Sequence, residues 1–439
     1  MKLEYSKLVG YLILIICSTH STFENNNNTS PRVSYPATDH SEECTTLECA
    51  YYQRIFREES KTRGFGQSGP DLIRGNGYKL EQHNLTSRDG YIISLFQILS
   101  GKDAKEKGHS SRIPVLLHHG VIADGFEWIL NKVDTALGYR LPDAGYQVFI
   151  INNRGTLYSL EHVNTSWKTG KYWDFSFHEM AAFDVPMIID YILELTNQPQ
   201  LYYIAHSMGS SIFMASLSMF PDYNSKIKTF IGLAPAVYVG NTSVPFAIAR
   251  PILLNHLQEM SNSYLLGSFV NPDFLPFMHI LGTLCYPQII SRKICFAALE
   301  VIFGYDFIED NYDLRQEIVS IGLSSTSVKT LLHLMQLWKS GKFQKYDYLE
   351  NNFEIYGQML PPLYELDKVT APVFVFCGAE DQLVSCRDAF RLASALPNLK
   401  EFHKINQQQF NHIDFLFATN VNSLLNDKIL EILNMTINT

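Results

Sequence analysis

The 439-residue sequence lacks three features that would point to other classes of protein. After the N-terminus, no stretch reaches the roughly 18 uninterrupted apolar residues typical of a membrane-spanning helix, so no membrane anchor is expected. The formal net charge is −9, which excludes the positive field that a nucleic-acid partner needs. No histidine, cysteine and carboxylate set stands at metal-ligand spacing, so neither a metal nor another cofactor is expected.

The N-terminus has the composition of a secretory signal peptide. Lys2 and Lys7 flank the start of an apolar run, 8–17, which gives way to small and polar residues. Ten apolar residues are too few to span about 30 Å of hydrocarbon, but they fit the pattern of a cleaved signal. A buried N-terminal helix is the alternative. We expect a signal peptide over 1–20 and a polar lead-in over 21–60, in a secreted or lysosomal protein.

Cysteines and glycosylation sequons agree with the secretory route. Six cysteines remain once Cys17 is removed, and pairing by proximity is one of about fifteen connectivities. The close pairs are Cys44 with Cys49, Cys285 with Cys295, and Cys377 with Cys386. The pair 285/295 is the strongest disulfide candidate and the pair 377/386 the weakest. The N-x-S/T sequons are Asn27, Asn28, Asn84, Asn164, Asn241 and Asn434, of which the last four are the glycosylation candidates.

Short strand-like runs alternate with helical segments along most of the chain. A helix is expected over 178–196, where apolar residues recur at three- and four-residue spacing. Such alternation predicts an α/β fold in which helices cover both faces of a mainly parallel sheet. The expected strands are 91–98, 113–118, 146–151, 201–205, 228–233, 372–377 and 400–405.

The alternation stops near residue 240 and resumes near residue 365. The intervening segment is rich in helix-compatible and aromatic residues. Insertions over the carboxyl edge of an α/β sheet commonly form lids and substrate pockets. We therefore expect an α/β core in two parts, 61–240 and 361–439, interrupted by a mostly helical cap over 241–360.

The strongest chemical signal is the pentapeptide Ala-His-Ser-Met-Gly at 205–209, between an expected strand and an expected helix. It matches the nucleophile elbow G-x-S-x-G, with alanine in place of the first glycine. The positions two before and two after the serine must be small, because strand and helix approach closely there. Ser207 is thus the expected nucleophile, and a serine in an ordinary loop is the alternative.

A serine hydroxyl needs a base to take its proton, and this elbow is followed along the chain by an acid and then a histidine. The strand 372–377 runs into Asp381, and the strand 400–405 is followed by His412. We assign His412 as the general base and Asp381 as the group that orients its ring. Glu380, next to Asp381, is the alternative acid.

Two backbone N–H groups are expected to stabilise the developing oxyanion. One belongs to Met208, directly after the nucleophile. The other belongs to Val121, because Gly120 would let the loop after strand 113–118 approach closely. His118 and His119 suggest a metal at first sight, but adjacent residues at a strand end point to opposite faces, and no metal site is expected.

Longer segments resemble the acid lipase family, the gastric and lysosomal lipases of animals and their arthropod relatives. They include LHHGVIAD at 117–124, NNRGTLYS at 152–159, YWDFSFHEMAAFDVPMIIDYI at 172–192 and NHIDF at 411–415. The resemblance covers nearly everything from about residue 65 to the end. It implies an α/β-hydrolase fold, a cap with a mobile lid, and hydrolysis of triacylglycerols or cholesteryl esters through an acyl-enzyme.

The resemblance also carries the triad to Ser207, Asp381 and His412, and the oxyanion donors to Val121 and Met208. Met208 replaces the family's usual Gln, and its backbone N–H is retained. The acid segment reads Ala-Glu-Asp-Gln-Leu at 379–383 where the family has G-H-D-W-L, and the cysteines that bracket it are not typical. Four further residues of the family signature are expected to be structural: Arg154, His178, Glu179 and Asp184.

Two other functions remain open from sequence. A carboxylesterase of small soluble esters would share the triad, but the long apolar insertion suits a lipid-sized pocket better. A lipase-like lipid carrier without turnover would usually have lost a triad member, and this sequence keeps a candidate for all three. Transient adsorption to a lipid surface is expected for a lipase and needs no anchor.

Overall fold

The computed structural model describes residues 68–99, 101, 113–241, 267–269, 314, 318, 324–407 and 409–437. Several predictions lie outside the described residues: the signal peptide, the lead-in, Asn27 and Asn28, the cysteines at 44, 49, 285 and 295, and much of the expected cap. Within the described part of the chain, no helix is long and apolar enough to cross a membrane.

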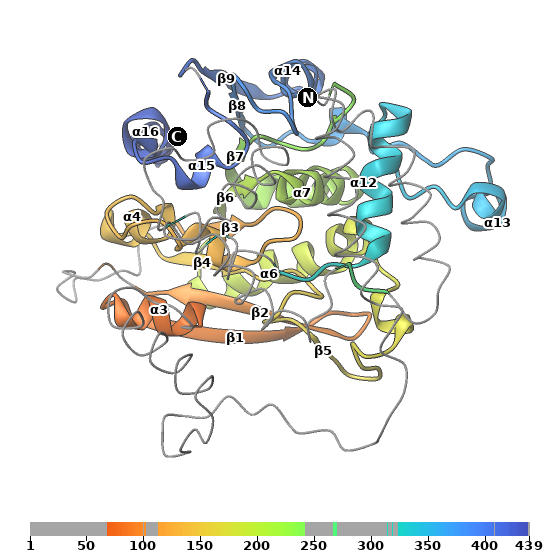
Figure 1. Cartoon of the computed structure of the whole chain (residues 1–439), viewed down its shortest axis with the longest axis horizontal. Coiled ribbons are helices and arrows are strands. Elements are labelled where there is room, and N and C mark those ends of the chain that lie inside the picture. Colours follow the sequence, from red (N-terminus) through yellow and green to blue (C-terminus); the bar gives the residue numbers. More distant parts are fainter. Residues whose placement is uncertain are drawn as a thin grey trace, which may run out of the picture. The chain divides into compact units, whose positions relative to one another are not determined.

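The described strands form one nine-stranded sheet in the order β1-β2-β4-β3-β6-β7-β8-β9, with β5 paired to β2 (Figure 1). Every neighbouring pair from β4 to β9 is parallel, whereas β2 pairs antiparallel with β1, β4 and β5. The strands are β1 Leu80–Thr86, β2 Tyr91–Ile98, β3 Val115–His118, β4 Val148–Ile151, β5 Glu161–His162, β6 Leu201–His206, β7 Ile227–Leu233, β8 Val373–Gly378 and β9 Leu399–Ile405.

All seven strands expected from sequence are present, and the mainly parallel α/β fold is confirmed. Two antiparallel strands, β1 and β5, were not expected. β1 reads Leu-Glu-Gln-His-Asn-Leu-Thr and is mostly exposed at the edge of the sheet, so it lacks the apolar run that marks the buried strands. β5 is only two residues long.

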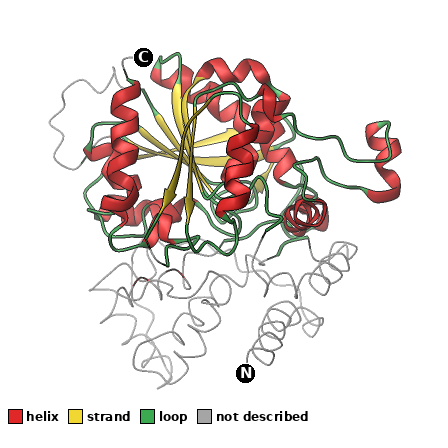
Figure 2. Cartoon of the chain, turned by 90° about the horizontal axis from the view of Figure 1, so that it is seen from above, coloured by secondary structure: helices red, strands yellow, loops and turns green. Residues whose placement is uncertain are grey.

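Helices lie on both sides of the sheet (Figure 2). Alternate side chains of β6 enter different cores, Tyr202 and Ile204 on one face and Tyr203 and Ala205 on the other, as the two-residue period of a strand requires. The helices are α3 Gly69–Gly75, α4 Leu137–Asp143, α5 Phe177–Glu179, α6 Val185–Thr196, α7 Met208–Met219, α12 Val328–Ser340, α13 Asn352–Tyr356, α14 Cys386–Ala395, α15 Asp414–Phe417 and α16 Asp427–Thr436.

The expected helix over 178–196 is interrupted. A π-helical turn, Met180–Asp184, separates α5 from α6. α5 begins at a capping box in which Glu179 accepts from the backbone N–H of Ser176, while Ser176 caps the N–H of His178. Apolar spacing alone cannot distinguish a single π turn from α-helix, so the sequence prediction merged the segments.

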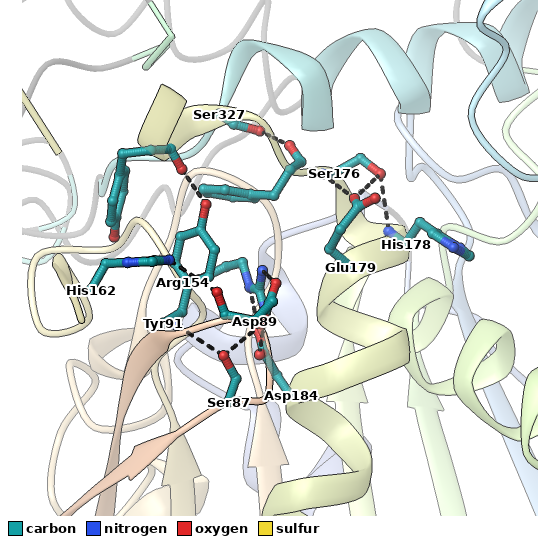
Figure 3. A network of polar contacts seen from close by, with 12 residues as sticks. Ser87, Asp89, Tyr91, Arg154, His162, Ser176, His178, Glu179, Asp184 and Ser327 are labelled. Carbon is teal, nitrogen blue, oxygen red and sulfur yellow. Dashed lines mark hydrogen bonds and ion pairs between the residues drawn. The ribbon is translucent and has the colours of Figure 1, made fainter. Parts of the chain in front are cut away.

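A fully buried guanidinium joins the π turn to the β1–β2 turn (Figure 3). Arg154 donates from Nε and Nη2 to the two carboxylate oxygens of Asp184 at 2.8 and 2.6 Å, and from Nη1 and Nη2 to those of Asp89 at 2.6 and 3.0 Å. The guanidinium also lies 4.0 Å from the ring centroid of Tyr91. These contacts support the structural role expected for Arg154 and Asp184.

A disulfide joins Cys377, in β8, to Cys386, at the start of α14. It brackets the loop that carries Asp381. This was the pairing that the sequence favoured least among the three.

Candidate active site

The predicted nucleophile stands on a sharp turn between β6 and α7. Ser207 has φ 52° and ψ −121°, a backbone conformation that L-residues rarely adopt, and its N–H donates to the Leu233 carbonyl oxygen at 2.9 Å. Ala205 is fully buried between His118 of β3 and Gly232 of β7. The methyl group of Ala205, which departs from the G-x-S-x-G pattern, is therefore accommodated within the core.

The side chains of Ser207, His412 and Asp381, predicted from chain order, lie next to one another in that sequence. Oγ of Ser207 lies 2.9 Å from Nε2 of His412, and Nδ1 of His412 lies 2.8 Å from Oδ2 of Asp381. All three residues are buried, with exposed fractions of 6%, 4% and 7%. Because Nδ1 donates to the carboxylate, Nε2 is left as the acceptor for the serine hydroxyl, which is the tautomer a general base needs.

The acid is held by its own loop. Oδ1 of Asp381 accepts the backbone N–H groups of Leu383 at 2.9 Å and Val384 at 2.8 Å, which leaves Oδ2 aimed at the imidazole. Glu380, the alternative acid, is exposed to solvent. The geometry therefore favours Asp381 over Glu380 as the partner of His412.

The loop that carries the predicted oxyanion donor packs directly against the nucleophile. A Cβ added at Gly120 would lie 3.3 Å from Cβ of Ser207 and 3.3 Å from Nδ1 of His206, tighter than most side-chain contacts, so glycine eases the close approach of the loop. Val121 follows and is partly buried against the core. Met208, the other predicted donor, is the first residue of α7.

His118 and His119 have their ring nitrogens engaged by protein groups. His118 contacts the Tyr203 hydroxyl at 2.5 Å and Oδ1 of Asn153 at 2.8 Å. His119 contacts the Gly120 carbonyl oxygen at 2.8 Å and accepts from the Asn153 N–H at 3.0 Å. Burial lowers the pKa of His118 to about 4 and that of His119 to about 3, so both rings are neutral. In the ranges that the structure describes, no group of three or more potential ligands is gathered for a metal.

One pair of site residues was missed by the sequence reasoning. His206, next to the nucleophile, donates from Nε2 to the main-chain carbonyl oxygen of His412 at 3.0 Å. Its Nδ1 faces Oε1 of Glu127 at 3.4 Å, and the Glu127 carboxylate accepts the N–H of Gly120 with both oxygens at 3.2 Å. One sequence feature could have pointed to Glu127: it stands between Phe126 and Trp128, and such an apolar context predicts that the carboxylate is buried.

The strand–serine–helix turn and the mainly parallel sheet define an α/β-hydrolase. The family profile described as "alpha/beta hydrolase fold" matches residues 113–416, and that described as "Partial alpha/beta-hydrolase lipase region" matches 70–132. Within this class, the chain belongs to the acid lipase family, as the curated relatives show.

Three of these relatives span most of both chains. Lipase 3 of Drosophila melanogaster is 34% identical over 82% of this chain and 91% of its own. Human gastric triacylglycerol lipase is 34% identical over 78% of this chain and 84% of its own. The lysosomal acid lipase/cholesteryl ester hydrolase of Macaca fascicularis is 32% identical over 83% of this chain and 90% of its own. Among solved structures, a thermophilic esterase from Thermogutta terrifontis matches 81% of this chain and 99% of its own, at 12% identity and a TM-score of 0.47.

Proposed function

We propose that this chain is a lipase that hydrolyses the carboxylic ester bonds of triacylglycerols, cholesteryl esters or both. The observation that carries the proposal is the 2.9 Å contact between Ser207 Oγ and His412 Nε2, with Asp381 on the far side of the ring. The class of substrate is supported by the named activities of the gastric and lysosomal relatives.

The reaction runs through an acyl-enzyme. His412 Nε2 takes the proton of the Ser207 hydroxyl as Oγ attacks the ester carbonyl carbon, and the carbonyl oxygen becomes an oxyanion that the N–H groups of Val121 and Met208 stabilise. Collapse of this intermediate breaks the bond to the alcohol oxygen, which takes the proton from His412. Water then repeats the sequence on the acyl-enzyme, releasing the fatty acid and restoring the serine.

Asp381 orients His412 and stabilises the imidazolium that forms in each half-reaction, and it stays ionised throughout. The two backbone N–H groups that its Oδ1 accepts hold the carboxylate in place while the charge on His412 changes. Burial of the three residues keeps water away from these hydrogen bonds and so strengthens them.

The experiment that tests the function compares wild type with Ser207→Ala on a long-chain triacylglycerol emulsion and on a soluble short-chain ester, from pH 4 to pH 8. Loss of long-chain hydrolysis by about 10³-fold or more in the variant would support the nucleophile and the lipase activity together. Wild-type activity on the soluble ester alone would identify an esterase. Lipid binding without wild-type turnover of either substrate would identify a carrier.

We also propose that 241–360 form a cap over this site and that the protein enters the secretory pathway, as the gastric and lysosomal relatives suggest. The four glycosylation candidates, Asn84, Asn164, Asn241 and Asn434, are all exposed, as glycan attachment requires. Expression in a secretory host, followed by N-terminal sequencing and peptide mass spectrometry, tests cleavage near residue 20 and glycan occupancy together. Transient adsorption to the lipid surface brings the site to its substrate without an anchor.

A further inference from the structure

A buried acid–imidazole pair lies next to the triad and contacts two other segments, the loop at Gly120 and the backbone of His412. Glu127, in the 3-10 turn Gly125–Trp128, binds the N–H of Gly120 in the oxyanion loop. His206, at the end of β6, binds the main-chain oxygen of His412. The side chains of Glu127 and His206 are only 5% and 4% exposed.

We propose that Glu127 and His206 form an ionised pair that positions the oxyanion loop and the backbone of His412, and that this positioning is lost when His206 gives up its proton. The proposal rests on the proposed function, and it assigns positioning roles, because neither side chain reaches the reacting atoms.

The surroundings of the ring favour its charged form, because Nδ1 is buried, makes no hydrogen bond and faces a carboxylate. Both nitrogens of His206 face acceptors, Nε2 the His412 carbonyl oxygen at 3.0 Å and Nδ1 the Glu127 carboxylate at 3.4 Å. A neutral imidazole carries one N–H and can serve only one of them. The imidazolium presents an N–H to each, and its charge offsets that of a carboxylate that would otherwise be buried unpaired, at a cost of several kcal/mol.

The electrostatic surroundings agree with this assignment. Burial by itself lowers the pKa of His206, but the Glu127 carboxylate, the His412 carbonyl oxygen and the nearby Asp381 outweigh it, so the pKa is raised above its ordinary value. The His412 ring lies 4.8 Å from the His206 ring, and His119 nearby is neutral. Asp124 lies near Glu127, and burial raises the pKa of Asp124 to about 6.

The direction of the pH effect follows from the raised pKa. Below that pKa the pair is ionised and both contacts are made. Above it, the ring keeps one N–H, so either the contact to Glu127 or that to His412 loses its donor. The positioned state is therefore the low-pH state, and turnover should fall on the alkaline side as His206 loses its proton.

Glu127→Gln gives a specific test because, with an amide at 127, the neutral rather than the protonated His206 ring makes both contacts. The glutamine oxygen can still accept from Gly120, while its NH₂ would donate to Nδ1 of a neutral His206 whose Nε2–H still serves His412. Without the carboxylate, burial keeps His206 neutral in this variant at every pH tested, so both contacts persist. We expect the ratio of kcat in Glu127→Gln to kcat in wild type to rise by about 10-fold or more from pH 5 to pH 9, because only wild type loses a contact on the alkaline side. KM for a soluble ester should change little.

Two further variants separate positioning from folding. Glu127→Leu removes the acceptor and should lower kcat by about 10-fold or more across the whole pH range. Asp89→Asn removes a carboxylate that pairs with Arg154 at the β1–β2 turn. It should lower the melting temperature and leave the variant-to-wild-type ratio of kcat constant with pH.

The experiment measures kcat and KM on a soluble p-nitrophenyl ester from pH 4 to pH 9, the rate of Ser207 phosphorylation by an organophosphate, and ¹⁵N NMR of the His206 ring. The His206 resonance is assigned by its absence in His206→Gln. We expect both ring nitrogens protonated near pH 6 in wild type and one in Glu127→Gln. A single protonated nitrogen in wild type, or a Glu127→Gln to wild-type ratio that does not vary with pH, would overturn the proposal. Failure of wild type to label at Ser207 would instead count against the proposed function, and the NMR result would still decide the protonation of the pair.

Discussion

Gly209 of α7 lies against the carbonyl oxygen of His118 so closely that a Cβ on it would sit 2.7 Å from that oxygen. The backbone of α7, directly after Ser207, and the end of β3 are thus in contact. The contact lies one residue after Met208, the predicted oxyanion donor.

Gly209→Ala should therefore disturb both stability and catalysis. The added carbon meets two backbone oxygens, of His118 and His119, which cannot rotate away. We expect a loss of about 2 kcal/mol or more in the free energy of unfolding, since overpacking typically costs 1–3 kcal/mol, and a fall in kcat. Urea denaturation and ester kinetics measure the two effects. Gly75→Ala, where nothing lies within 4 Å, is the control and should change neither.

Substitution of the two neighbouring acids should identify the partner of His412. Asp381→Asn leaves an amide at the imidazole and is expected to lower kcat by about 10²–10⁴-fold, because the ring then takes the wrong tautomer. Glu380→Gln changes an exposed side chain and should leave kcat within about two-fold. The reverse ranking in kinetics on a soluble ester would transfer the role to Glu380.

Arg154→Met should be among the most destabilising single substitutions. It leaves the carboxylates of Asp89 and Asp184 without their shared cation, and removing one partner of a buried ion pair costs about 3–5 kcal/mol. Chemical denaturation of the purified variant measures this loss. Lys226→Met, which breaks the partly exposed pair with Asp190, is the matched control and should cost at most about 1 kcal/mol. Equal losses in the two variants would contradict the structural role of Arg154.

Removal of the Cys377–Cys386 disulfide should lower stability more than activity. The bridge closes a nine-residue separation, and chain-entropy arguments assign a loop of this size about 2–3 kcal/mol. Cys377→Ser with Cys386→Ser should lower the melting temperature while kcat at low temperature stays within a few-fold, because Asp381 is also held by two backbone N–H groups. A collapse of kcat without a change in melting temperature would mean that the bridge itself holds the acid.

The strands and the turn at Ser207 could be predicted from sequence because each depends on residues that are close together in the chain. Chain order also indicated that Asp381 and His412 follow strands whose ends meet near Ser207, and the His412 ring does lie within hydrogen-bond distance of both Ser207 and Asp381. The contact between Glu127 and His206 could not be predicted, because it joins a 3-10 turn to a strand end about 80 residues later and only packing decides which acid meets which imidazole. The edge strand β1 and the π turn were missed since both lack a distinctive apolar pattern.

The neighbouring strands β7 and β8 are separated by about 140 residues of sequence, and loops of that length close slowly during folding. Ser207 precedes this insertion, whereas Asp381 and His412 follow it. During synthesis, the ribosome therefore completes the elbow well before either partner residue exists. A nascent or truncated chain would carry a formed serine turn with no base to activate it, so hydrolytic competence would arrive only with the last strands, after the whole insertion has been made.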